Sequence, residues 1–141
     1  LAARLGIGKD EIQHEVESTR RNVQERMETF GGDNPDRAIE GKDAVITDDG
    51  LAAGYTMRAA IEAIQDLSPA RIVVAVPTAP LSAVSRIARM VDLVVCLNIR
   101  SGPFFAVADA YVEWHDLTED EVLQYLSGAR DRGLMRAEAT G

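Results

Sequence analysis

Two neighbouring carboxylates are the residues of this chain best suited to do chemistry. The stretch VITDDGLAAGYT, residues 45–56, sets Asp48 and Asp49 side by side at the end of an apolar run, although adjacent like charges repel. Ionised carboxylates accept hydrogen bonds, so the pair is suited to hold the vicinal hydroxyls of a diol. A plain turn at the end of a strand is the alternative interpretation.

The seven residues that follow the carboxylates form a segment suited to a phosphate. They are Gly50, Leu51, Ala52, Ala53, Gly54, Tyr55 and Thr56. A tight turn entering a helix leaves backbone N–H groups free, and small side chains let a phosphate approach them. Thr56 adds a hydroxyl donor. A ligand with a phosphate at one end and a diol nearby is a ribose 5-phosphate. The motifs GxxxxGK[ST] and GxGxxG, which mark P-loop and dinucleotide sites, are absent.

The surrounding pattern predicts a parallel α/β sheet that would position this segment. Residues 43–47, 71–76 and 92–98 are apolar runs without alternation, typical of strands covered on both faces. Helical spacing predicts a helix over 55–67 and another that begins with Pro80 as its first residue. The apolar residues of this second helix expected to be buried are Leu81, Val84, Ile87, Ala88 and Met90. Ligands of such sheets bind beyond the carboxyl ends of the strands, where the carboxylate pair stands.

Helices are also predicted near both ends of the chain. Apolar residues recur at helical spacing over 11–30, where Asp10 opens a sequence that resembles a capping box. DLTEDEVLQYL predicts a last helix with Thr118 as N-cap and Glu121 completing a capping box. The aromatic stretch 101–114 before it predicts one short edge strand. The tail after this helix has weak periodicity and is expected to be flexible.

Composition limits the partners and the compartment. Acidic residues outnumber basic ones by 23 to 15 and the net charge is −8, which argues against nucleic acid as a partner. The one cysteine, Cys96, allows no intrachain disulfide and favours a reducing cytoplasm. No apolar run approaches the roughly 18 residues of a membrane span. The chain opens LAARLGIGKDE without Met, so we expect a fragment or a processed product.

Beyond these patterns, AVITDDGLAAGYT resembles the phosphoribosyl-pyrophosphate (PRPP) signature of the type I phosphoribosyltransferases. That signature has four apolar and two acidic residues before a small-residue loop commonly ending Ala-Thr-Gly-x-Thr. The chain is most similar to phosphoribosyltransferases of unassigned substrate in bacteria and archaea. Later segments match that group in order: RIVVAVPTAP, VVCLN, PFFAVADAYVEW and TEDEVLQYL. The resemblance runs from about residue 40 to 127, and the helix over 11–30 is similar to the one before the motif.

The resemblance implies a fold and a domain plan. The fold is a three-layer, Rossmann-like parallel sheet flanked by helices, of the phosphoribosyltransferase type, and we expect its N-terminal strand or strands to be missing. We expect a single domain over residues 1–141. Its parts would be an N-terminal helix and loop (1–35), the core (40–127) and a flexible tail (128–141).

The resemblance also implies an activity. Asp48 and Asp49 would hold the ribose 2′- and 3′-hydroxyls as the catalytic pair, and residues 50–56 would cradle the 5-phosphate. A nitrogen nucleophile, usually a base, would displace pyrophosphate from C1 of PRPP. Mg²⁺ would be held mainly by PRPP and water. Family members commonly dimerise, which leaves a homodimer open.

Two departures from the signature leave a second function open. Ala53 stands where Thr is usual, which removes one hydroxyl contact worth about 1 kcal/mol. Tyr55 stands where a small residue is usual. The alternative is therefore a non-catalytic regulatory domain that binds PRPP or ribose 5-phosphate. A haloacid-dehalogenase-like phosphatase ranks last, because that family needs Asp-x-Asp followed by Gly-Thr.

Other side chains have weaker claims to a role. The basic candidates for pyrophosphate are Arg20, Arg21 and Arg26, for which a solvated helix face is the preferred interpretation. The candidates for a hood over the base are Phe104, Phe105 and Tyr111, for which packing is at least as strongly indicated. Trp114 is expected to be a core or rim aromatic. His14 and His115 have no partner at metal-ligand spacing.

Overall fold

A computed structural model of the chain describes residues 8–30, 39–102 and 104–135. The chain falls into two compact units: a sheet unit, Asn34–His115, and a helical unit made of Leu1–Asp33 and Asp116–Gly141. The elements are α1 (Lys9–Phe30), β1 (Asp43–Thr47), α3 (Tyr55–Gln65), β2 (Arg71–Pro80), α4 (Leu81–Ile87), β3 (Leu93–Arg100), the 3₁₀ helix η2 (Val107–Ala110) and α5 (Glu119–Asp131). The expected single domain over residues 1–141 and its subdivision stay a prediction.

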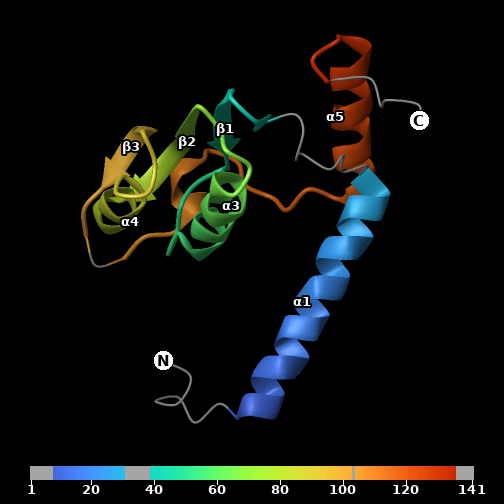
Figure 1. Ribbon diagram of the computed structural model, residues 1–141, viewed down its shortest axis with the longest axis horizontal. Helices are drawn as coiled ribbons and strands as arrows, with labels where there is room; N and C mark the ends of the chain where they lie inside the picture. The colour runs from blue at the N-terminus through green and yellow to red at the C-terminus, as the bar shows by residue number, and fades with distance from the viewer. Residues whose placement is uncertain (1–7, 31–38, 103, 136–141) are drawn as a thin grey trace. The chain divides into compact units, whose positions relative to one another are not determined.

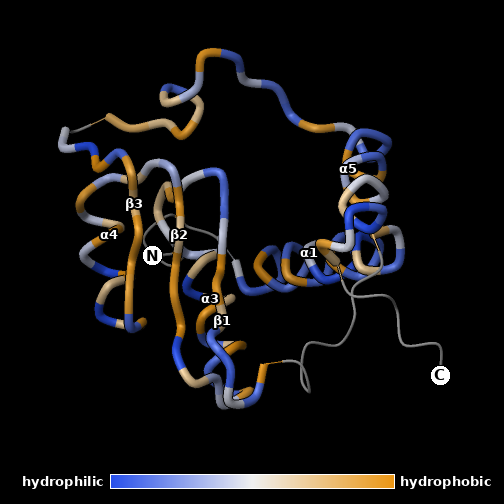
Figure 2. The backbone as a smooth tube through the Cα atoms, turned by 90° about the horizontal axis from the view of Figure 1, so that it is seen from above, coloured by the Kyte–Doolittle hydropathy of each residue, from blue (hydrophilic) through white to orange (hydrophobic). Residues whose placement is uncertain are grey.

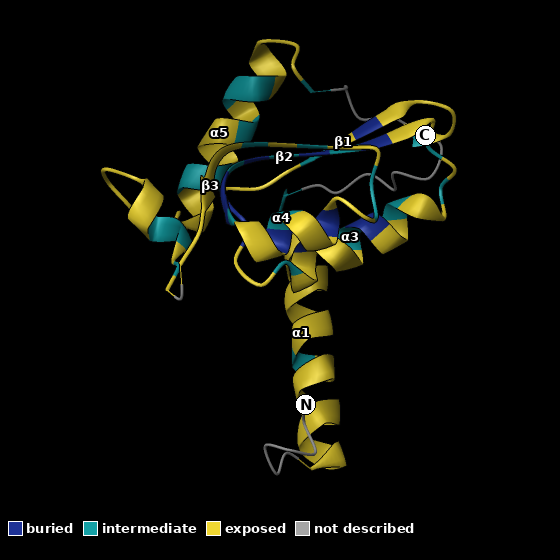
Figure 3. Ribbon diagram, turned by 90° about the vertical axis from the view of Figure 1, so that its left-hand side faces the viewer, coloured by how far each residue is buried: buried dark blue, intermediate teal, exposed yellow. Residues whose placement is uncertain are grey.

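The sheet unit is built on three parallel strands in the order β1–β2–β3 (Figure 1). Asp43 pairs with Arg71 and Thr47 with Ala75 across the first two strands. Helix α3 connects β1 to β2, and α4 connects β2 to β3. Both helices lie on one face of the sheet (Figures 1 and 3). The predicted α/β class with a parallel sheet is therefore confirmed.

The core of this unit lies between β2 and the two helices. Alternate residues of β2 face it, since Ile72, Val74 and Val76 are at most 4 % exposed. Each helix presents apolar residues at i, i+4 spacing to the sheet, which is the spacing of one helix face. These are Met57 and Ile61 of α3 and Ala83 and Ile87 of α4. Figure 2 shows the apolar character of β2 and β3, and Figure 3 shows burial concentrated in β2 and the helix faces toward it.

Strand β2 and helix α4 correct the predicted boundaries. The strand continues past residue 76 to Pro80 because its pairing with β3 continues, while Pro77 takes no part in that pairing. Pro80 is the N-cap of α4, with φ −72° and ψ 146°, and is not its first helical residue. Leu81 is 52 % exposed and Ala88 is exposed, so two residues expected in the core lie outside it. Ala83 is buried in their place.

The predicted edge strand in residues 101–114 is wrong. The described residues of this stretch form no strand and contain only η2. Phe104 and Val112, an aromatic and a β-branched residue of this stretch, are almost fully exposed. Val107 instead packs toward the loop after β1, so tertiary contact decides the local conformation.

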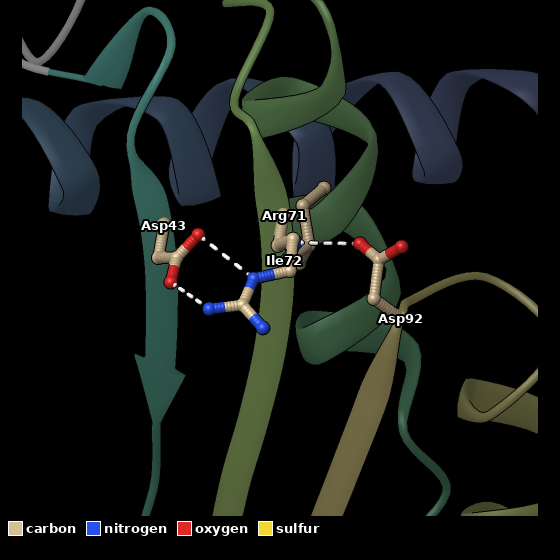
Figure 4. Close-up of polar contacts among 4 residues, drawn as sticks. All are labelled: Asp43, Arg71, Ile72 and Asp92. Atoms are coloured by element: carbon tan, nitrogen blue, oxygen red, sulfur yellow. Dashed lines mark hydrogen bonds and ion pairs between the residues drawn. The ribbon is translucent and has the colours of Figure 1, made fainter.

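Polar contacts link the amino ends of the strands, at the end of β1 away from Asp48 (Figure 4). The Arg71 guanidinium donates to both carboxylate oxygens of Asp43, with Nε 3.0 Å from Oδ1. This hydrogen-bonded partner lowers the pKa of Asp43 and raises the pKa of Arg71. Asp92 Oδ2 accepts from the Ile72 N–H at 2.8 Å, just before β3. These contacts hold the first residues of the three strands in register.

The helical unit contains α1 and α5, which contact each other. The predicted helix over 11–30 is confirmed, although none of its residues is buried. The capping box at Asp10 is wrong, because Asp10 already lies in the first helical turn. The capping box of Thr118 and Glu121 is confirmed. Helix α5 continues to Asp131, beyond the expected start of the tail at residue 128.

Among the described residues, no helix combines the length and the apolar character needed to cross a bilayer.

Candidate functional site

The carboxyl end of β1 opens into a pocket of about 430 Å³, a size typical of small-molecule sites. The lining residues are Asp48, Asp49, Gly50, Leu51, Ala52, Ala53, Gly54, Tyr55, Thr56, Met57, Val107 and Trp114. The structure therefore brings together all nine residues that the sequence singled out. It adds Met57, Val107 and Trp114. The site lies wholly within the sheet unit.

The two carboxylates stand at the start of this lining. Both residues are exposed, and the Asp49 N–H donates to Asp48 Oδ1 at 3.0 Å. Burial, followed by the negative charge of Asp48, raises the pKa of Asp49. The charged form of Asp49 is therefore less stable here than in water, and a hydroxyl donor or a nearby positive charge would relieve that cost.

Gly50 is needed because of the space around it. A Cβ at this position would lie 2.7 and 3.0 Å from the two methyl carbons of Val107 and 3.1 Å from Thr78 Cγ2. Real Cβ atoms do not make contacts at the shortest of these distances. The chain can turn away from the sheet under η2 only because residue 50 has no side chain.

Leu51 anchors the loop to the sheet. Its side chain is 2 % exposed and belongs to the core, and its N–H donates to the Thr78 carbonyl at 3.0 Å. That N–H is committed to the protein, so the contribution of Leu51 to the pocket is to hold the loop in place. The sequence pattern did not separate this role from ligand binding.

The far end of the loop leads into α3 without a side-chain cap. Gly54 is the N-cap, with φ 75°, a conformation that glycine adopts without strain. Glycine has no side chain that could cap the helix, and no other described side chain is hydrogen-bonded there. The first turn of α3 therefore presents free backbone N–H groups, with Thr56 adding its hydroxyl, and this is an arrangement that favours an anion. Tyr55 is 68 % exposed, so it does not fill the loop from inside.

Two contacts from distant segments fix the loop carbonyls. Arg86 Nη1 of α4 donates to the Ala53 carbonyl at 2.7 Å. The Tyr111 hydroxyl donates to the Asp49 carbonyl at 2.6 Å. The Tyr111 ring also packs on Trp114, with 5.0 Å between ring centroids and 60° between planes. The segment after η2 is therefore attached to the carboxylate end of the pocket.

The aromatic residues considered for a hood over the base differ in their position relative to the pocket. Phe104 is 94 % exposed and does not line the pocket. Tyr111 contacts the loop backbone, whereas Trp114 lines the pocket itself. Sequence reasoning assigned Trp114 to the core or rim. Its position beside the pocket depends on the pairing with Tyr111, for which the sequence holds no signal.

The remaining candidates show no assembled site. Within the described ranges, no three His, Cys, Asp or Glu residues are grouped so that they could hold a metal ion. Cys96 lies on β3 and is half-buried. The arginines Arg20, Arg21 and Arg26 lie on α1, in the helical unit, and their suggested contact with pyrophosphate stays a prediction.

Comparison with known proteins places this chain in a family. The profile of the family described as "Phosphoribosyl transferase domain" matches residues 1–109. The chain belongs to the phosphoribosyl transferase domain family. The resemblance noted in the signature segment is thereby confirmed, and the pocket described above is built from that segment. Proteins of this family are transferases.

Similar proteins support the assignment and show its extent. Two proteins of Mycobacterium tuberculosis, strains CDC 1551 and H37Rv, are each 36 % identical over 107 residues and bear the name "Putative phosphoribosyl transferase". The match covers 76 % of this chain and 24 % of either relative. The crystal structure of TT1426 from Thermus thermophilus aligns with a TM-score of 0.68 at 31 % identity. That alignment covers 89 % of this chain and 59 % of the neighbour.

Proposed function

We propose that the pocket binds the 5-phosphoribosyl group of PRPP and that the chain provides the donor site of a phosphoribosyltransferase. One observation carries the proposal. A single pocket has two adjacent carboxylates at one end of its loop and an uncapped helix N-terminus at the other. These are the groups that the hydroxyls and the phosphate of a ribose 5-phosphate need. The family of the chain supports the same ligand.

The proposed roles follow from the hydrogen-bonding capacity of each group. Asp48 and Asp49 accept hydrogen bonds from the ribose 2′- and 3′-hydroxyls. The N–H groups from Ala52 to Thr56, with the Thr56 hydroxyl, surround the 5-phosphate. Leu51 and Gly50 hold and shape the loop. Ala53 lacks the hydroxyl that the family signature usually carries at this position, and the Tyr55 side chain is 68 % exposed. Both residues then contribute through their backbones.

The proposed reaction is a displacement at C1 of the ribose. A nitrogen nucleophile forms the new C1–N bond, and the C1–O bond to pyrophosphate breaks with its electron pair leaving on the pyrophosphate. Positive charge develops on the ring in the transition state, and the neighbouring carboxylates stabilise it electrostatically. The loop holds the phosphate still while this happens, which lowers the entropic part of the barrier.

Mg²⁺ enters this scheme with the substrate. The described residues include no metal-binding cluster, and the two loop carboxylates are committed to ribose in the proposal. Bound to pyrophosphate oxygens and water, the ion would neutralise charge on the leaving group. Asp48 and Asp49 are the carboxylates that line the pocket and would face such an ion.

The catalytic part of the proposal is tested with the complete protein. PRPP and a panel of nitrogenous bases are mixed with the enzyme, and pyrophosphate release is followed at steady state. Base-dependent release that falls in the Asp48→Asn, Asp49→Asn double variant is the expected result. PRPP binding without release for any base would favour the regulatory alternative, in which the ligand is sensed and not consumed. Absence of both binding and release would refute the proposed function.

A further inference from the structure

We propose that Arg86 is a positioning residue for the phosphate end of the pocket. By holding the Ala53 carbonyl, Arg86 would orient the next peptide N–H, that of Gly54, toward the 5-phosphate. The inference rests on the proposed function and extends it to a residue outside the signature segment, 33 positions away from its contact in the sequence.

The first support is the contact itself. Arg86 lies in the last turn of α4, and its Nη1 is 2.7 Å from the Ala53 oxygen, a good distance for a charge-assisted hydrogen bond. The next residue, Ile87, is fully buried, and its side chain is the nearest group to the position of a Cβ on Gly54, at 3.8 Å. The end of α4 therefore meets the loop with two successive residues.

The second support is the geometry of the peptide bond. The described chain has no cis peptide, so the carbonyl of Ala53 and the N–H of Gly54 point in opposite directions from one plane. A carbonyl held by Arg86 therefore turns the Gly54 N–H away from α4. No acceptor within the described residues takes that N–H. The guanidinium also polarises the peptide, which strengthens the N–H as a donor.

The Arg86 contact bears on the presence of Ala53 where the family signature usually has Thr. Arg86 binds the backbone of residue 53 and is indifferent to its side chain. The loop can thus keep its shape without the usual Thr hydroxyl. The competing explanation is that Arg86 merely stabilises α4, because a positive charge in the last turn interacts favourably with the helix dipole.

Calorimetric titration of ribose 5-phosphate into the full 141-residue chain separates the two explanations. Arg86→Met should weaken binding about tenfold, the loss typical of one charge-assisted hydrogen bond. Arg86→Lys keeps a charge and a donor and should recover part of the affinity. Arg89→Met is the matched control, since it removes the same charge three residues later from an exposed side chain outside the pocket. It should bind as the wild type does.

Two further readouts identify the part of the ligand involved. Arg86→Met should weaken the binding of inorganic phosphate by the same factor as the binding of ribose 5-phosphate. This factor should be unchanged when Arg86→Met is introduced into the Asp48→Asn, Asp49→Asn double variant, because the two ends of the loop act independently. Circular dichroism and thermal unfolding check that the variants are folded.

The outcomes are distinct. Wild-type binding with an Arg86→Met affinity within about twofold of it would overturn the role of Arg86 and leave the proposed function standing. Equal losses in Arg86→Met and Arg89→Met would also overturn it, since general charge would then explain the effect. Absence of binding by the folded wild-type chain would overturn both proposals.

Discussion

Replacing Gly50 with Ala tests the packing that shapes the pocket. The new Cβ would meet both methyl groups of Val107 and Cγ2 of Thr78 at 2.7 to 3.1 Å. Thr78 is fully buried and cannot retreat, and the β-branched Val107 side chain is restricted in its rotation. The backbone of η2 must therefore shift to make room.

The size of the effect follows from two opposing terms. Overpacking a well-packed site costs about 1–3 kcal/mol. Replacing Gly by Ala also makes the unfolded chain less flexible, which returns about 0.4–1 kcal/mol. Since the residues of η2 are half-buried or exposed and its backbone can shift in part, we expect a net loss of about 1–2 kcal/mol in the free energy of unfolding. This corresponds to roughly a 1 M lower urea midpoint.

Urea unfolding followed by tryptophan fluorescence measures this loss of stability in the sheet unit. Trp114 is the single tryptophan of the chain and belongs to the sheet unit. The control is Gly128→Ala in α5, where a Cβ would meet nothing within 4 Å. It should leave the Trp114 transition unchanged and stabilise the helix by about 0.5–1 kcal/mol.

A second substitution makes the test specific to the predicted contact. Val107→Ala removes both methyl carbons that a Cβ at Gly50 would strike. The cost of Gly50→Ala should therefore shrink by at least about 0.5 kcal/mol when it is measured in the Val107→Ala background. A Gly50→Ala protein as stable as the wild type would refute the reasoning, as would a cost that Val107→Ala leaves unchanged.

Three further predictions concern polar contacts of the sheet unit. Tyr111→Phe removes the hydroxyl bound to the Asp49 carbonyl, so urea unfolding should show a loss of about 1 kcal/mol, whereas Tyr125→Phe, at an exposed site, should show none. Burial raises the pKa of Asp49 above 3.8, so the folded chain binds more protons than the unfolded chain just above that pH, and stability falls as pH rises through the window. Asp49→Asn should therefore be more stable than the wild type at pH 7, and equal or lower stability would contradict this sign. The hydrogen bond from Arg71 lowers the pKa of Asp43, so its stabilisation is present above pH 3.8 and is lost as pH falls through the lowered pKa. Asp43→Asn should remove that acid-side loss, and an unchanged pH profile would show that the pair does not contribute.

Much of the sheet unit was accessible from the sequence because its signals are local. β1 matches its predicted residues 43–47, and α3 begins at the predicted residue 55. Apolar runs and helical spacing report burial directly, and the glycines mark the turn between them. The loop segment was found for the same reason, since its carboxylates and small residues are contiguous in the chain.

The errors occur where distant contacts outweigh local preference. The strand predicted over residues 71–76 continues to Pro80, because the pairing of β2 with β3 resumes at Thr78 after Pro77. The aromatic stretch after β3 suggested a strand, but Val107 packs near Gly50 and Tyr111 bonds to the loop. Neither contact leaves a periodic trace in the sequence.

The roles of the pocket residues also depend partly on local sequence and partly on distant contacts. The sequence assigned all of residues 50–56 to the phosphate, whereas the structure shows that Leu51 is an anchor whose N–H is bound to the Thr78 carbonyl. It also adds Arg86 and Trp114, which come from an element and a segment far along the chain. Only the folded sheet brings them to the loop.

The most direct test of the central claim is the affinity of the 141-residue chain for ribose 5-phosphate. Calorimetry would compare the wild type with the double variant Asp48→Asn, Asp49→Asn, after circular dichroism has shown that both are folded. Ribose 5-phosphate is the suitable ligand because it needs only the carboxylates and the loop that line this pocket. Saturable binding by the wild type that weakens in the variant is the predicted result. A folded wild-type chain that does not bind, or a variant that binds equally well, would contradict the account.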